Sequence, residues 1–213
     1  MTMKTESTEL IFVLDKSGSM HGLEKDTIGG FNSTVEKQRK EEGEVKVTTV
    51  LFDTLFTTIH DRMDIKDVPV MTEDDYCPSG CTALLDAVGT TIDRFIKEQK
   101  DSDAASKTLM IITTDGLENA SKEYSYDTVN RLISDQKEKG WEFIFMGANI
   151  DAAKEAVRMG ISKENAVDYV CDDEGIKACY NSVDCAIKNV RKGVKLKECS
   201  WRAEADMDFK RRA

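Results

Sequence analysis

Several features that define other classes of protein are missing from this sequence. It contains no run of about 20 apolar residues, which a transmembrane helix would require, so we expect no membrane association. Only two prolines occur among its 213 residues, and no proline-rich linker divides the chain. Lys and Arg number 30 against 40 Asp and Glu. The net charge of −10 argues against nucleic-acid binding, which needs a basic surface to contact phosphates.

The motifs of several enzyme classes are missing as well. The sequence has no G-x-x-x-x-G-K-[ST] phosphate loop, no G-x-G-x-x-G dinucleotide motif and no G-x-S-x-G nucleophile motif. It contains only two histidines, so a general base is difficult to place. Its first nine residues include acidic side chains where a secretory signal peptide has an apolar segment. We therefore expect a cytoplasmic protein that is not an enzyme.

The six cysteines do not follow the pattern of a zinc site. Cys77 and Cys81 are spaced as C-x3-C, but no second cysteine pair or histidine pair would complete four zinc ligands. A disulfide between these two residues is an alternative that no other feature of the sequence supports. The remaining four are expected to be buried or partly buried thiols, and they are Cys171, Cys179, Cys185 and Cys199.

Short apolar runs mark the expected strands. Four such runs occupy residues 10–14, 45–52, 109–112 and 143–146. Three of them are continuous rather than alternating, which is typical of strands buried on both faces of a parallel sheet. Only two residues separate Phe52 from Leu55. Because a parallel crossover needs about a dozen residues, the segment 55–62 is predicted to return as an antiparallel edge strand.

Helical periodicities alternate with these runs. They cover residues 23–35, 85–100, 129–136, 152–157 and 176–190. The third is predicted to end near Gly140, since glycine favours the left-handed conformation after a helix. The last is predicted to begin near Asp172 and Asp173, whose charges suit a helix N-terminus. The alternation predicts an α/β fold that is Rossmann-like and doubly wound, with helices on both faces of a mostly parallel sheet and one antiparallel edge strand.

Charge separates the C-terminal segment from the rest of the chain. Residues 191–213 contain eight Lys or Arg and four Asp or Glu, a net charge of +4, whereas residues 1–190 carry −14. We predict one domain over 1–190, followed by a basic C-terminal tail or terminal helix extension over 191–213. No feature of the sequence predicts the oligomeric state.

Oxygen-bearing side chains lie at three points where the predicted sheet would end. Asp15, Ser17 and Ser19 follow the first strand, Thr82 precedes the best-patterned helix, and Asp115 follows the strand at 109–112. Binding sites in open α/β sheets lie beyond the carboxyl ends of the strands. Carboxylate and hydroxyl oxygens suit a hard cation. Two carboxylates nearly neutralise a divalent ion, which would keep a coordination position for water or for a carboxylate of a partner.

These residues resemble the metal-ion-dependent adhesion site of von Willebrand factor type A domains. The family pattern is Asp-x-Ser-x-Ser, then a Thr in a glycine-rich loop, then an Asp after a central strand, and all five positions match here. The resemblance covers about residues 8–190 and is to small stand-alone bacterial or phage members. The sequence departs from the pattern at Cys81, where the family usually has glycine.

The resemblance implies a Mg²⁺-dependent binding role, with Mn²⁺ or Ca²⁺ as alternative ions. It implies that Ser17, Ser19 and Thr82 hold the ion directly, and that Asp15 and Asp115 hold it partly through water. The ion would then bind an Asp or Glu of a partner protein. An AAA+ ATPase is one candidate partner, because related bacterial domains often work beside such enzymes.

Other interpretations of these residues are also open. A Mg²⁺-dependent phosphohydrolase would place a second acid where Ser17 stands, and a purely structural protein could have lost metal binding. Glu118 and Asn119 could bind a water ligand of the ion or form a polar turn. The remaining candidates are more simply structural or solvated, and they are the acidic run 73–75, His21 in the loop after the first strand and His60 on the edge strand.

Overall fold

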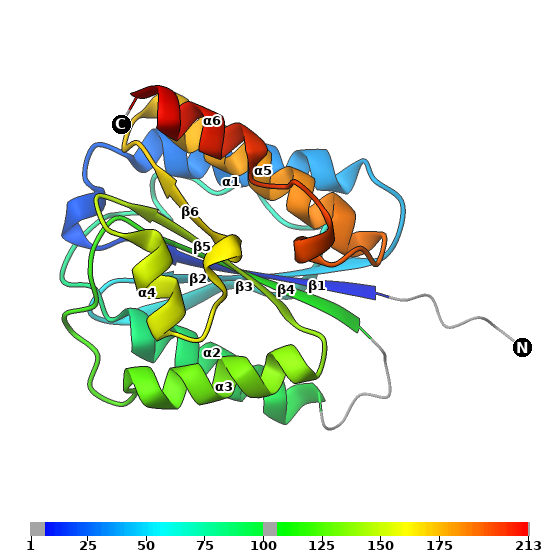
Figure 1. Cartoon of the computed structure of the whole chain (residues 1–213), viewed down its shortest axis with the longest axis horizontal. Coiled ribbons are helices and arrows are strands. Elements are labelled where there is room, and N and C mark those ends of the chain that lie inside the picture. The colour runs from blue at the N-terminus through cyan, green and yellow to red at the C-terminus, as the bar shows by residue number, and fades with distance from the viewer. Residues whose placement is uncertain (1–6, 100–105, 213) are drawn as a thin grey trace, which may run out of the picture.

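A computed structural model describes residues 7–99 and 106–212, and within them six strands form one sheet (Figure 1). The strands are β1 (Ser7–Asp15), β2 (Val45–Phe52), β3 (Phe56–Asp64), β4 (Ser106–Thr114), β5 (Glu142–Ala148) and β6 (Ala166–Tyr169). They lie in the order β3-β2-β1-β4-β5-β6. Neighbouring strands are parallel except for β2 and β3, which are antiparallel. The predicted antiparallel edge strand is therefore confirmed.

Helices cover both faces of this sheet, as predicted for a doubly wound fold (Figure 1). On one face lie α1 (Glu24–Arg39), α5 (Asp173–Arg191) and α6 (Ala203–Arg212), and on the other lie α2 (Leu84–Gln99), α3 (Tyr126–Glu138) and α4 (Ala152–Arg158). Short 3-10 turns occur at η1 (Gly18–Met20), η2 (Lys163–Asn165) and η3 (Leu196–Glu198). No helix in the described ranges combines the length and apolar character needed to cross a membrane.

The continuous apolar run of β1 reflects burial on both sides. Leu10, Phe12 and Leu14 belong to the core shared with α1 and α5. Ile11 and Val13 belong to the second core, beneath α2 and α3. Because successive strand residues point to opposite faces, both sets must be apolar when helices cover both faces.

The two predicted helix ends are confirmed by their backbone geometry. Gly140 follows the end of α3 with φ of +91°, the left-handed conformation that glycine adopts without a steric penalty. Asp172 precedes α5, and its carboxylate accepts a hydrogen bond of 2.9 Å from the backbone N–H of Gly175. That bond satisfies one of the donors left free at a helix N-terminus.

The C-terminal third agrees with the sequence predictions in one feature and departs from them in two. The strand β6 has only four residues, too few to stand out by periodicity. Residues 203–212 form α6, which packs against α5 and β6. This helix agrees with the prediction that residues 191–213 could form a terminal helix extension. The domain boundary at residue 190 stays a prediction. The expectation that Cys185 is buried is wrong, because it lies on the exposed side of α5.

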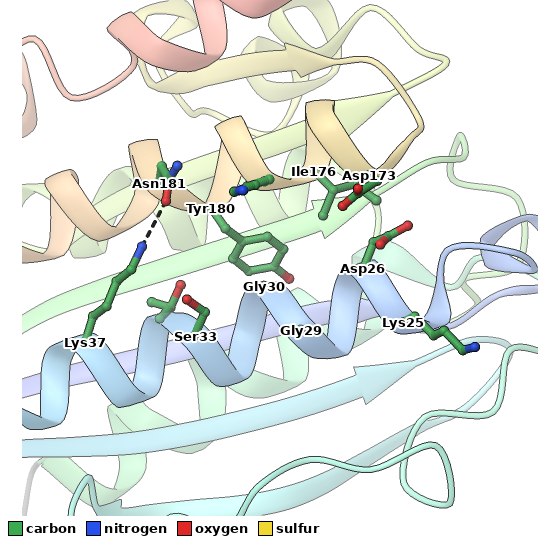
Figure 2. Close-up of a pocket in the computed structure, with 12 residues that line it drawn as sticks. Lys25, Asp26, Gly29, Gly30, Ser33, Lys37, Asp173, Ile176, Tyr180 and Asn181 are labelled. Atoms are coloured by element: carbon green, nitrogen blue, oxygen red, sulfur yellow. Dashed lines mark hydrogen bonds between the residues drawn. The ribbon is translucent and has the colours of Figure 1, made fainter.

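The contact between α1 and α5 depends on a glycine. Figure 2 shows Tyr180 of α5 pointing toward α1 at Gly30, beside a groove of about 490 Å³ between the two helices. A Cβ atom on Gly30 would lie 2.1 Å from the Tyr180 ring, whereas one on the neighbouring Gly29 would meet no atom within 4 Å. The two helices can therefore pack this closely only with glycine at position 30.

This pair of glycines gives a matched test of the helix packing. Gly30→Ala is expected to lower the free energy of unfolding by about 2 kcal/mol, because overpacking a buried contact outweighs the better helix propensity of alanine. Gly29→Ala is expected to raise it by about 0.5–1 kcal/mol, because only the propensity changes. Urea denaturation of both variants measures these shifts. Equal effects of the two substitutions would contradict the packing described here.

Candidate metal-binding site

The first part of the candidate site is the loop that leaves β1. The Asp15 carboxylate accepts a 2.7 Å hydrogen bond from the backbone N–H of Ser17. This bond and the short turn η1 fold the chain back, so that the hydroxyls of Ser17 and Ser19 lie 3.1 Å apart. The spacing of one residue between the serines thus brings both hydroxyls to the same point.

The second part comes from the end of β4, the neighbour of β1 in the sheet. The hydroxyl of Thr114 donates to the second carboxylate oxygen of Asp15 over 2.6 Å. The hydroxyl of Ser19 donates to the carboxylate of Asp115 over 2.5 Å. Four of the five predicted residues therefore form one hydrogen-bonded cluster that links two strands far apart in the sequence.

The Thr82 loop (residues 78–83) completes the site. Its Gly80 carbonyl accepts a 3.1 Å bond from the backbone N–H of Gly18, which ties it to the serine loop. The hydroxyl oxygens of Thr82 and Ser19 lie 3.3 and 3.5 Å from the position that a Cβ on Gly116 would occupy. The hydroxyls of Thr82 and Ser19 therefore approach the same point beside Gly116, where a side chain at position 116 would be crowded.

Burial distinguishes the members of this cluster. Asp15 is completely buried, and Ser17, Thr82 and Asp115 are also buried, whereas Ser19 is exposed and opens the cluster to solvent. Burial raises the pKa of Asp15 to about 6, with a smaller contribution from the negative charge of Asp115. Burial also raises the pKa of Asp115. Two carboxylates that are costly to ionise, beside three hydroxyls, form a donor set that fits a hard divalent cation.

Glu118 and Asn119 hold the Thr82 loop in place. The side-chain oxygen of Asn119 accepts from the backbone N–H of Thr82, and the Asn119 N–H donates to the Thr82 carbonyl, both over 3.0 Å. The Glu118 carboxylate accepts from the backbone N–H groups of Leu85 and Ser121 over 2.9 and 2.7 Å. The turn interpretation therefore describes both residues better than a role in binding water.

Three supporting residues were missed by sequence reasoning. Thr114 binds Asp15, as described above, and the Tyr76 hydroxyl donates to the Asp15 backbone carbonyl. Asp53 forms an ion pair with Lys16 and accepts from the backbone N–H of Leu55 over 2.8 Å. Only Asp53 carried a sequence signal, because an acid in a two-residue turn often binds the backbone two residues further on.

The other candidates have local roles. His21 is exposed and contacts Glu24 over 3.2 Å, while His60 is buried and hydrogen-bonds the Thr49 hydroxyl over 3.0 Å. In the acidic run, Asp75 binds the backbone and hydroxyl of Thr72, each over 2.8 Å. Cys77 and Cys81 are free, exposed thiols. Across residues 7–99 and 106–212, no three His, Cys, Asp or Glu side chains group as metal ligands, so a cation here would depend on hydroxyls.

Comparisons with known proteins relate this chain to a group of solved structures. No protein-family model and no curated protein matches the sequence. The von Willebrand factor domain of the pilus tip protein Mfa5 from Porphyromonas gingivalis superposes with a TM-score of 0.63 at 10% identity, covering 91% of this chain and 98% of that one. Manganese-loaded TRAP protein from Plasmodium vivax superposes with a TM-score of 0.57 at 15% identity, covering 79% of this chain and 70% of that one.

A third structure is proximal thread matrix protein 1 from the mussel byssus, solved with zinc in its MIDAS motif, the metal-ion-dependent adhesion site. It superposes with a TM-score of 0.57 at 15% identity and covers 91% of this chain. The chain spans only 47% of the length of that protein. At these identities the likeness concerns the fold.

Proposed function

We propose that this chain, which has the von Willebrand factor type A fold, is a divalent-cation-dependent protein-binding module. Its ion would be held by Asp15, Ser17, Ser19, Thr82 and Asp115. The observation that carries the proposal is the grouping of these side chains. Asp15, Ser17, Ser19 and Asp115 form one hydrogen-bonded cluster, and the hydroxyls of Thr82 and Ser19 both border the Cβ position of Gly116. Mg²⁺ is the proposed ion, and Mn²⁺ or Ca²⁺ would suit the same oxygen donors.

Each group has a distinct role in this proposal. The hydroxyls of Ser17, Ser19 and Thr82 bind the ion directly and add no charge. The carboxylates of Asp15 and Asp115 nearly balance a divalent charge and bind partly through water. When bound, the ion supplies an electrophilic coordination position for the Asp or Glu of a partner protein. The exposed Ser19 lies on the side from which that partner would approach.

The structural neighbours support the general class of this function. Two of them were solved with a divalent metal, zinc in one case and manganese in the other, and a third belongs to a pilus tip. The finer assignments remain proposals that rest on the resemblance of the sequence: a bacterial or phage origin, a cytoplasmic location and an AAA+ ATPase as partner.

The burial of Asp15 favours a binding role over a phosphohydrolase. A nucleophilic carboxylate must reach its substrate, but Asp15 has no exposed surface, and its two oxygens accept bonds from Ser17 and Thr114. Metal-dependent turnover of p-nitrophenyl phosphate that disappears in Asp15→Ala would revive the enzymatic interpretation.

The Thr82 hydroxyl provides the test of the proposed function. Thr82→Ala is expected to weaken Mg²⁺ binding about tenfold in a calorimetric titration, because one uncharged ligand is lost. Its melting temperature in EDTA should stay within about 2 °C of the wild type, because Asn119 holds the loop through the backbone. Ser134→Ala removes an exposed hydroxyl from α3 and is the matched control. A wild-type protein that binds no divalent ion, or a partner retained equally in Mg²⁺ and EDTA, would contradict the proposal.

A further inference from the structure

Three exposed apolar side chains belong to segments that adjoin the candidate site. Leu55, Phe56 and Leu117 expose 76%, 42% and 56% of their surface, although each belongs to a short polar turn or its edge. In the residues that the structure describes, the other large exposed hydrophobics are Val70 in the loop after β3, Val157 in α4 and Met207 in α6.

Leu55 lies in the β2–β3 turn and Phe56 begins β3, next to the Thr82 loop. The Thr54 hydroxyl accepts a 2.9 Å bond from the backbone N–H of Cys81, which joins the turn to that loop. The Ser79 hydroxyl donates to the Asp53 carboxylate over 3.2 Å and makes a second connection. Leu55 and Phe56 directly follow this junction.

Leu117 lies in the segment after β4, which also contacts the Thr82 loop. It follows Gly116, and the hydroxyls of Thr82 and Ser19 lie 3.3 and 3.5 Å from the Cβ position of that glycine. Asn119, two residues further on, is bound to the backbone of Thr82. The three side chains, which we call the apolar rim, therefore belong to the two segments that are bonded to the loop presenting Thr82.

The hydrogen bonds of the turn do not require apolar side chains at the positions of the apolar rim. The backbone N–H of Leu55 binds Asp53, and this bond would form with any side chain at position 55. Large apolar groups left in water are typical of binding surfaces, because a partner that covers them removes them from solvent. Lys16, the basic residue of the serine loop, is paired with Asp53 and does not offer a countercharge to an incoming acid.

We propose that the apolar rim selects partner segments in which the ion-binding Asp or Glu is flanked by apolar side chains. This inference rests on the proposed function, since the ion binds the carboxylate while Leu55, Phe56 and Leu117 contact its neighbours. The ion supplies the electrostatic attraction, and the rim distinguishes one acidic segment from another. Polar or charged flanking residues would leave the rim in water and bind more weakly.

A peptide-display library tests this preference directly. Peptides with a central Glu and three randomised residues on each side are bound to the full chain in Mg²⁺ and eluted with EDTA, which recovers only ion-dependent binders. We expect Leu, Ile, Val, Met or Phe to be enriched next to the Glu. The dissociation constant of an enriched peptide should rise about fivefold to twentyfold in the Leu55→Ser/Leu117→Ser variant.

Val70→Ser is the matched control for this variant. Val70 exposes 67% of its surface and lies beside the later turns of α1, where Arg39 binds the Val68 carbonyl over 2.7 Å. This substitution should leave peptide binding unchanged. All three positions are exposed, and unchanged melting temperatures would verify that the variants fold.

The outcomes separate the apolar rim from the proposed function. EDTA-eluted peptides with polar or random residues beside the Glu would contradict the proposed selectivity of the apolar rim and leave ion-dependent binding intact. If calorimetry shows Mg²⁺ binding but no peptide is eluted with EDTA, the proposed selectivity of the apolar rim is also contradicted. A chain that binds no Mg²⁺ would refute both.

Discussion

Replacing Asp115 with alanine is expected to weaken Mg²⁺ binding at least 100-fold. The substitution removes one of two negative charges beside the proposed ion, and attraction between close charges near a protein surface is worth roughly 4 kcal/mol per unit pair. The variant should still fold, because burial already raises the pKa of Asp115 and makes its ionised form costly in the ion-free protein. Calorimetric titration of the two proteins measures the loss.

The control for this prediction separates a specific ligand from general charge. Asp135→Ala removes the same charge from an exposed position on α3, away from the site, and should change the Mg²⁺ affinity by less than about twofold. If Asp115→Ala and Asp135→Ala had the same effect, Asp115 would not be a ligand of the ion.

The second large effect concerns the protonation of Asp15 in the absence of metal. Its pKa is about 6 in the folded protein against 3.8 for an ordinary Asp, so the folded state binds the proton more tightly than the unfolded state. Lowering the pH from 6 toward 3.8 should therefore stabilise the EDTA-treated wild type relative to Asp15→Asn. The expected gain is about 1.4 kcal/mol per pH unit and about 3 kcal/mol in total.

Urea denaturation of both proteins across this pH range provides the measurement. The difference between them isolates Asp15 from groups such as Asp53 and Asp172, whose pKa values are lowered and which act in the opposite direction. Saturating Mg²⁺ at pH 7 should stabilise the wild type, because the ion replaces the missing proton. The Mg²⁺ affinity should fall about fivefold between pH 6 and pH 5, as Asp15 becomes protonated. Parallel stability curves of wild type and Asp15→Asn would contradict the cause given for the shift.

Five of the six described strands, and the candidate site residues at their ends, could be predicted because their signals are local. A continuous apolar run such as 109–112 is typical of a strand buried on both faces, and Asp15, Ser17 and Ser19 lie within five residues of one another. Their position at the end of a buried strand also follows from the alternation of strands and helices.

The supporting contacts could not be predicted, because they join residues far apart in the sequence. Tyr76 reaches the Asp15 carbonyl across 61 residues, and Thr114 reaches its carboxylate across 99. Neither pair has a spacing that local periodicity encodes. The close approach of Gly30 and Tyr180 is of the same kind, since it appears only after α1 and α5 are packed. Tertiary contacts therefore determine how firmly the site is held.

Anomalous diffraction from crystals grown in Mn²⁺ tests the central claim most directly. Manganese takes the same oxygen ligands as magnesium and can be located by its scattering. The account predicts one strong peak within coordination distance of the hydroxyls of Ser17, Ser19 and Thr82, on the side of Gly116, and no such peak in Asp115→Ala crystals. A peak elsewhere on the chain, with these hydroxyls still bonded only to protein, would contradict it.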